Sequence, residues 1–281
     1  MNCKEVIFVN HTQKDNTISY EDAIKNHSDS QIIINTTPCG MYPNNDDLII
    51  DIKYFDKLCG VIDVIYNPLR TKMIQKAKKR NLKNATGLYM LVAQAIYASS
   101  IFLGKEIDLD LIDKVYEDLY KAKRNIVLIG MPSSGKTTIG KMLAKKLKRD
   151  FFDSDKELEK VLGCEISSFL NDENEEVFRN FEEEVIRNLS MKSGVVIATG
   201  GGVIKREINI KRLKQNGKVI FIDRNLEHLV PTSSRPLSSN LDSLKQLYKE
   251  RYQLYVDTAD IHIENNDVDL FEIVSKIKNE V

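Results

Sequence analysis

The stretch NIVLIGMPSSGKT, at residues 125–137, decides the fold of the second half of this 281-residue chain. Asn125–Ile129 predicts a buried strand, Gly130–Thr137 completes the pattern G-x-x-x-x-G-K-[ST], and Thr138–Leu147 predicts an amphipathic helix. The glycines of such a loop let successive backbone N–H groups face phosphate oxygens, and the positive end of the helix dipole adds to the attraction. The stretch therefore predicts a P-loop that binds ATP or GTP.

The side chains of the loop have roles that follow from this geometry. Lys136 is placed to bridge the β- and γ-phosphates, and the Thr137 hydroxyl is placed to ligate Mg²⁺. We expect ATP with Mg²⁺ as the cofactor, although the loop itself does not distinguish ATP from GTP. The nucleotide is expected to contact seven residues, namely Gly130, Ser133, Ser134, Gly135, Lys136, Thr137 and Thr138.

Two further segments are expected to end at the same edge of the sheet. Asp153 and Asp155 follow the apolar pair Phe151-Phe152, so one carboxylate can organise Mg²⁺ through water while the other accepts a proton from an attacking hydroxyl. Such a pair is also common in solvated turns. The predicted strand Val195–Thr199 is followed by three glycines, Gly200, Gly201 and Gly202. Their bare backbone can face the crevice where ligands bind, or the run can be a flexible turn.

Three arginines are harder to place from the residues alone. Arg179 and Arg251 lie in charged helical segments, so each is expected to be a solvated surface charge. Arg235 lies in Ser233–Leu237, which fits either a mobile lid that carries a cation to the phosphates or a plain exposed loop.

The fold class predicted for the whole chain is α/β. From residue 124 onward, strands alternate with helices, as in a P-loop NTPase of the nucleoside monophosphate kinase type with helices on both faces of a parallel sheet. In the first 120 residues, apolar runs at Val6–Val9, Ile32–Ile34 and Val61–Ile65 between helical segments predict a parallel α/β sheet. The resemblance described below implies that this part is an incomplete Rossmann-like domain. Leu88–Leu103 predicts a buried helix and Leu109–Lys123 an amphipathic one. We expect two domains, at 1–120 and 124–281.

Composition limits the possible partners and compartments. Lysine and arginine together number 41, as do aspartate and glutamate, so no general affinity for nucleic acid or anionic membranes is expected. No apolar run is long enough to predict a transmembrane helix. The four cysteines lack metal-site spacing, which favours reduced thiols and a cytoplasmic protein.

The order of the motifs in residues 124–281 resembles that of shikimate kinases. The motifs are the P-loop, Asp153-Ser154-Asp155, Phe178-Arg179 followed by Glu182-Glu183, Gly200–Gly202, Arg235-Pro236-Leu237 and Arg251–Tyr255. The resemblance implies ATP-dependent phosphorylation of a shikimate ring hydroxyl to shikimate 3-phosphate, in the biosynthesis of chorismate and aromatic amino acids. A kinase of the same fold for another hydroxy acid, such as gluconate, is the alternative.

The resemblance also implies roles for single residues. Asp155 would bind the shikimate hydroxyls and act as the base, and Asp153 would serve Mg²⁺ through water. Arg179 and Arg251 would hold the shikimate carboxylate, for which the planar guanidinium is suited. Gly200–Gly202 would lie against the ring. Arg235 would reach the nucleotide from a lid at about 228–240, which is shorter than in the family and carries Val230-Pro231 in place of basic residues. Lys136, Asp155 and Arg235 would be the catalytic residues.

Residues 1–120 resemble the cofactor-binding half of shikimate dehydrogenase. The resemblance is carried by Asn10-His11-Thr12, Ile34–Met41, Asp63–Thr71 and Gly87–Ala95. His11 replaces the arginine that reads the NADP 2′-phosphate in that family, and Tyr89 replaces a glycine, while Gln94 matches a substrate contact.

The expected dehydrogenase is incomplete in this chain. No G-x-G-x-x-G motif precedes Val6, and the substrate domain with its lysine and aspartate is missing, so we expect neither hydride transfer nor secure NADP binding. A truncated sheet exposes an edge and apolar surface. We therefore expect self-association, or pairing with a separately encoded dehydrogenase half. A non-catalytic docking or regulatory role for this half is the alternative to an enzymatic one.

Overall fold

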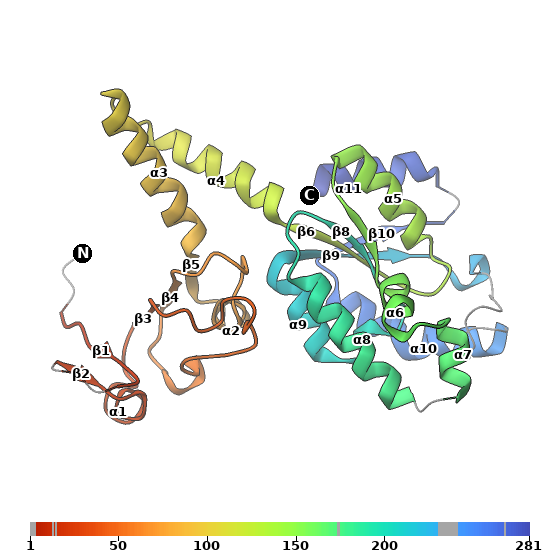
Figure 1. The fold of residues 1–281 in the computed structure, drawn as a ribbon, viewed down its shortest axis with the longest axis horizontal. Helices are drawn as coiled ribbons and strands as arrows, with labels where there is room; N and C mark the ends of the chain where they lie inside the picture. The colour runs from red at the N-terminus through yellow and green to blue at the C-terminus, as the bar shows by residue number, and fades with distance from the viewer. Residues whose placement is uncertain (1–3, 13, 15, 173–174, 230–240, 267) are drawn as a thin grey trace. The chain divides into compact units, whose positions relative to one another are not determined.

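The computed structural model describes residues 4–12, 14, 16–172, 175–229, 241–266 and 268–281 (Figure 1). The chain divides into two compact units, Met1–Tyr116 and Glu117–Val281. The division falls within helix α4 (Leu109–Lys123). We call these parts unit 1 and unit 2 and describe each by itself.

Unit 2 is built on a five-stranded parallel sheet in the order β10-β9-β6-β8-β7. The central strand β6 is buried along its whole length, as the sequence predicted. Because all five strands run in the same direction, the loops that follow β6, β7 and β8 meet at one edge of the sheet. The strands are β6 (Asn125–Ile129), β7 (Phe151–Asp153), β8 (Val196–Ala198), β9 (Gly217–Asp223) and β10 (Ile261–Glu264).

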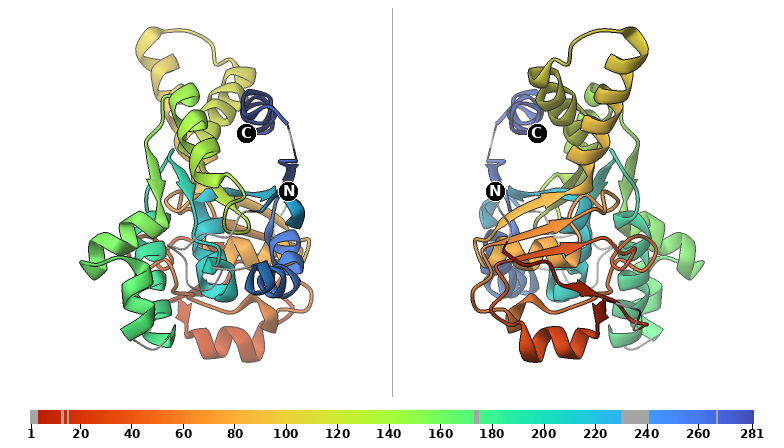
Figure 2. Two further views of the ribbon diagram at one scale, coloured as in Figure 1. Left: turned by 90° about the vertical axis from the view of Figure 1, so that its right-hand side faces the viewer. Right: turned by 90° about the vertical axis from the view of Figure 1, so that its left-hand side faces the viewer.

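Helices cover both faces of this sheet, because alternate side chains of each strand point to opposite faces. Val127 and Ile129 pack into one apolar cluster, while Ile126 and Leu128 pack into another. The first cluster includes residues of α6, α8, α9 and α10, and the second includes residues of α5 and α11 (Figures 1 and 2). The predicted arrangement of helices on both faces is thus confirmed.

The helices of unit 2 connect the strands, and three of them follow one another between β7 and β8. They are α5 (Lys136–Leu147), α6 (Ser154–Leu162), α7 (Ile166–Asp172), α8 (Glu175–Ser190), α9 (Glu207–Asn216), α10 (Leu241–Thr258) and α11 (Leu270–Glu280), with short 3₁₀ turns η2 (Val203–Lys205) and η3 (Leu226–His228).

Unit 1 is also an α/β arrangement, with one two-stranded and one three-stranded parallel sheet. Val9 and Ile33, from the two sheets, pack against one shared apolar cluster that includes Ile74 and Ala77 of α2. The elements are β1 (Phe8–Val9), β2 (Thr17–Ile18), α1 (Tyr20–Asn26), β3 (Ile32–Asn35), η1 (Ile52–Tyr54), β4 (Gly60–Asp63), α2 (Lys72–Lys79), β5 (Lys83–Thr86) and α3 (Gly87–Leu103).

One expectation for unit 1 is wrong. Helix α3 forms where predicted, but only Gly87, Leu88 and Val92 of its seventeen residues are buried. The apolar composition that predicted burial is real, but the described residues of unit 1 do not themselves supply the surface that would cover this helix. In those same residues, no helix is both long and apolar enough to span a bilayer.

Candidate active site

The P-loop connects β6 to α5 through backbone conformations that need glycine. Gly130 and Gly135 have φ angles of +147° and +93°, and a Cβ atom on Gly130 would lie 2.5 Å from the Ile222 carbonyl oxygen. Ser133 also adopts a positive φ, of 63°, and Ser134 is fully buried. Thr138 is exposed on the first turn of α5. The loop therefore has the tight turn that the motif predicted.

The Lys136 side chain folds back over this loop and is buried. Its Nζ atom donates hydrogen bonds to the carbonyl oxygens of Gly130 at 2.9 Å and Met131 at 2.7 Å. Asn265, at the end of β10, donates from Nδ2 to the Ser134 carbonyl oxygen at 2.8 Å and so braces the loop from outside. We did not predict this contact, because no local pattern links residues 131 positions apart.

Asp153 and Asp155 lie at the carboxyl end of β7, beside the P-loop. The Thr137 hydroxyl donates to Asp153 Oδ2 at 2.7 Å, and Asp153 Oδ1 caps α6 by accepting from the Asp155 backbone N–H at 3.1 Å. A threonine hydroxyl next to a carboxylate is a pair of hard oxygen donors suited to Mg²⁺, which takes its other ligands from water and phosphate. The donor set therefore fits this ion.

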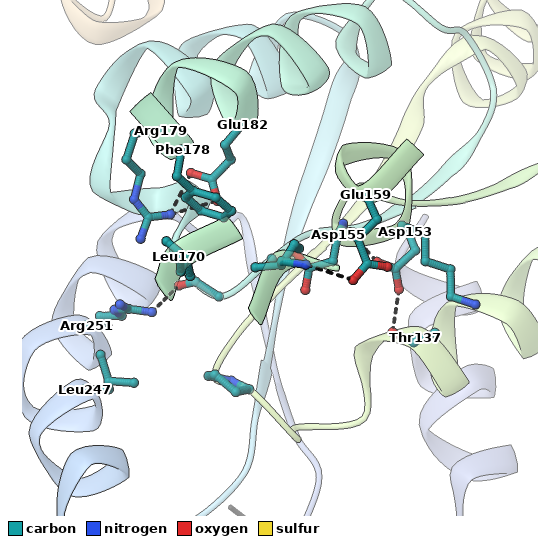
Figure 3. Close-up of a pocket in the computed structure, with 16 residues that line it drawn as sticks. Thr137, Asp153, Asp155, Glu159, Leu170, Phe178, Arg179, Glu182, Leu247 and Arg251 are labelled. Atoms are coloured by element: carbon teal, nitrogen blue, oxygen red, sulfur yellow. Dashed lines mark hydrogen bonds and ion pairs between the residues drawn. The ribbon is translucent and has the colours of Figure 1, made fainter. Parts of the chain in front are cut away.

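A cavity of about 270 Å³ opens at this edge of the sheet (Figure 3). It is lined by residues from five motifs that are separate in the sequence, including Thr137, Asp153, Asp155, Arg179, the glycines 200–202 and Arg251. The two carboxylates lie on the side of the P-loop, and the two guanidinium groups lie on the opposite side (Figure 3). The cavity thus brings acidic groups, bare backbone and cations together around one space that is open to solvent.

Arg179 is buried, so the expectation of a solvated surface charge is wrong for this residue. Its Nη1 atom donates to both carboxylate oxygens of Glu182 at 2.9 Å, and its Nη2 atom donates to Glu175 at 3.0 Å. Burial by itself would lower the pKa of Arg179, but the two glutamates raise it, so the guanidinium stays charged. Burial raises the pKa of Glu182; Arg179 opposes this shift, and nearby Asp155 adds to it.

Arg251 is buried as well, which corrects the same expectation for this residue. Its Nη1 atom donates to the Gly201 carbonyl oxygen at 3.1 Å, and the Tyr255 hydroxyl donates to the same oxygen at 2.6 Å. Both side chains come from α10, where positions four apart lie on one face of the helix. Helix α10 is therefore fixed to the glycine run, and the Arg251 guanidinium lies at the cavity wall.

The glycines after β8 make room for the charged side chains of the cavity. A Cβ atom on Gly200 would overlap Asp155 Oδ1, and one on Gly202 would lie 2.8 Å from Cζ of Arg179. Neither residue has a positive φ angle, so the close approach of these side chains, and not backbone strain, requires glycine here.

The remaining predicted site residue, Arg235, lies with positions 230–240 of the expected lid outside the described residues. Every other predicted site residue lies in the P-loop, in the first turn of α5 or in the wall of the cavity. Glu182, which holds Arg179, is a cavity residue to which we had assigned no role. Its spacing of three from Arg179 on a helix was the available signal.

Comparison with known proteins is consistent with this geometry. The family described as shikimate kinase matches residues 132–281. A shikimate kinase of Clostridium botulinum (strain Eklund 17B / Type B) is 43% identical over 160 residues, which cover 56% of this chain and 96% of that protein. The structure of shikimate kinase from Acinetobacter baumannii in complex with shikimate is 34% identical, with a TM-score of 0.55, and covers 58% of this chain and 95% of that chain.

The N-terminal part has a partial match of its own. A chorismate mutase/shikimate 5-dehydrogenase fusion protein from Clostridium acetobutylicum is 35% identical with a TM-score of 0.35, and the match covers 37% of this chain and 38% of that chain. The family match in unit 2 extends over more than half of the sequence and includes most of the P-loop and every other motif named above. This chain belongs to the shikimate kinase family.

Proposed function

We propose that unit 2 transfers the terminal phosphoryl group of ATP to a ring hydroxyl of shikimate, giving shikimate 3-phosphate for the synthesis of chorismate and aromatic amino acids. One observation carries the proposal. The cavity beside the P-loop has a carboxylate, Asp155, on one side and two buried arginines, Arg179 and Arg251, on the other. This arrangement suits a substrate that has a hydroxyl group at one end and a carboxylate at the other.

In the proposed reaction, a hydroxyl oxygen of shikimate forms a bond to the terminal phosphorus of ATP. The bond from that phosphorus to the oxygen that leaves with ADP breaks, and the hydroxyl proton passes to Asp155. Arg179 and Arg251 hold the substrate carboxylate, so that the hydroxyl stays in line with the phosphorus. Lys136 exchanges its bonds to loop carbonyls for bonds to the β- and γ-phosphates.

Thr137 and Asp153 would hold Mg²⁺, directly and through water respectively, and the ion would neutralise phosphate charge. Gly200–Gly202 would form the floor under the substrate ring. Arg235 would approach the nucleotide from the expected lid. We assign the kinase to residues 124–281 and a second domain, related to shikimate dehydrogenase, to residues 1–120.

The proposal is tested by measuring ADP release from ATP by the full chain, with and without shikimate. We expect release to depend on shikimate. Lys136→Ala and Asp155→Asn are each expected to lower kcat by about 100-fold or more, because each removes a group that stabilises the transition state. Full activity in either variant would contradict the assigned role.

Gluconate, offered in place of shikimate, is the control for the acceptor. Phosphorylation of gluconate without phosphorylation of shikimate would establish the alternative kinase. Lys156→Ala is a matched control for the variants, because this lysine also lines the cavity but has no assigned role. Its kcat is expected to stay within a few-fold of the parent value.

A further inference from the structure

Helix α3 of unit 1 is unusual in being apolar, uncharged and exposed at the same time. Its residues 87–103 include no aspartate, glutamate, lysine or arginine, whereas 29% of the whole chain is charged. Ile101, Phe102 and Leu103 are 79%, 86% and 67% exposed, and Met90 is 54% exposed. A helix that is apolar around its circumference belongs in a protein interior. The buried apolar side chains of α3 are Leu88 and Val92, near its start, so most of this helix is uncovered.

The three-stranded sheet of unit 1 has an apolar face that no helix among the described residues of unit 1 covers. One face packs on α2, through side chains such as Val61. On the other face, Ile34 and Ile62 are neighbours in register and are 57% and 39% exposed, and Ile32 is 55% exposed. Parallel sheets are normally covered on both faces, usually by the helix that follows each strand. Here the helix that follows β5 is α3, and it leads away from the sheet and does not fold back across it (Figure 1).

We propose that two copies of this chain form a symmetric dimer in which α3 of each copy covers the open sheet face of the other. The open face is defined by Ile32, Ile34 and Ile62 of the three-stranded sheet. In the described part of unit 1, the sheet lacks a helix on its open face, and α3 lacks an apolar surface to pack against. The two surfaces on one chain therefore complement each other. Such a pair of identical contacts around a two-fold axis is the usual form of a protein dimer.

The extent of the two surfaces matches what a dimer requires. The six most exposed large side chains of α3 and the three of the open face together present roughly 1,050 Å², taking about 200 Å² for a fully exposed large side chain. A stable interface needs about 800 Å² from each partner. Neither surface has a charged residue at its centre that would need a charged partner; Lys83 lies at the margin of the open face. A second copy of the chain is therefore a sufficient partner.

The test uses the full chain and measures mass in solution by size-exclusion chromatography with light scattering. The wild-type protein is expected at twice the chain mass of 32.2 kDa. Phe102→Asp in α3 and Ile34→Lys in the open face are each expected to give monomers. Phe271→Asp is the matched control, because Phe271 is 71% exposed but lies on α11 of unit 2. Its mass is expected to stay that of the dimer.

Mixing the two monomeric variants tests the reciprocal arrangement. In a mixed dimer, the intact α3 of the Ile34→Lys chain meets the intact face of the Phe102→Asp chain, and the second contact pairs aspartate with lysine. The mixture is therefore expected to recover a dimer that neither variant forms alone. An Ile34→Lys variant that still dimerises would overturn the proposal in favour of helix–helix pairing.

Two further outcomes would also overturn the proposal. A wild-type protein that is monomeric at micromolar concentration would mean that a second copy does not cover these surfaces. Flotation with phosphatidylcholine vesicles, lost in Phe102→Asp, would mean that α3 contacts lipid instead. ADP release should be equal in all variants, which confirms that unit 2 remains folded.

Discussion

Substituting Gly202 by alanine is expected to disturb the positioning of shikimate and to leave nucleotide binding unchanged. The new methyl group would lie 2.8 Å from Cζ of Arg179, whereas an ordinary contact needs about 3.4 Å or more. Nη1 would lie closer still to the new methyl group, so the guanidinium must move by about 0.6 Å or more, which disrupts its two hydrogen bonds to Glu182. Misplacement on this scale costs about 100-fold in rate. Because Gly202 has a φ of −96°, alanine adds no backbone strain, and the change acts through Arg179 alone.

Steady-state kinetics with each substrate varied in turn would measure this effect. We expect kcat/KM for shikimate to fall by about 100-fold, mostly through KM, with KM for ATP unchanged within about twofold. Gly200→Ala is the companion variant, because its methyl group would displace Asp155 and should lower kcat instead. The reasoning is refuted if Gly202→Ala leaves KM for shikimate unchanged while its thermal midpoint matches that of the parent.

Three further predictions concern the charged and titrating groups. Glu182→Ala leaves the buried Arg179 with only Glu175, so the free energy of unfolding in urea should fall by about 3 kcal/mol; a loss below about 1 kcal/mol would contradict the role of the pair. Hydrogen bonds from Lys205 and Arg179 lower the pKa of Glu175, so the ionised carboxylate stabilises the fold above the ordinary pKa range of glutamate, and this stabilisation disappears as the pH falls. The melting temperatures of the parent and Glu175→Gln should therefore differ at about pH 7 and converge near pH 3. A difference that stays constant with pH would refute this. Burial raises the pKa of the Cys39 thiol, with Asp47 and Asp63 adding to the shift and Lys72 opposing it. Iodoacetamide at pH 8 should therefore modify Cys39 more slowly than the exposed Cys59, as followed by mass spectrometry. Equal rates would contradict the shift.

The parts of the site that the sequence predicted are those whose residues are close together in the chain. The P-loop turn and helix α5 follow from a single strand–loop–helix segment, and Asp153 ends the next strand along the chain. The carboxyl ends of parallel strands meet at one edge, so Asp155 and the glycines after β8 could also be placed near the loop.

What could not be predicted depends on contacts between distant segments. Arg179 and Glu182, three residues apart in a charged helix, look the same in sequence whether that helix face is solvated or buried. The burial of Arg251 depends on the Gly201 carbonyl oxygen, and the brace from Asn265 depends on the order of the strands. For α3, composition predicted an interior position, which the described residues of unit 1 do not by themselves provide.

The most direct test of the central claim is to identify the phosphorylated product. The full chain would be incubated with ATP, Mg²⁺ and shikimate, and the reaction followed by mass spectrometry and phosphorus NMR. We predict that shikimate gains one phosphoryl group, bound as a monoester at a ring hydroxyl, for each ADP formed, and that Asp155→Asn abolishes this product. ADP formed together with free phosphate and unchanged shikimate would contradict the account.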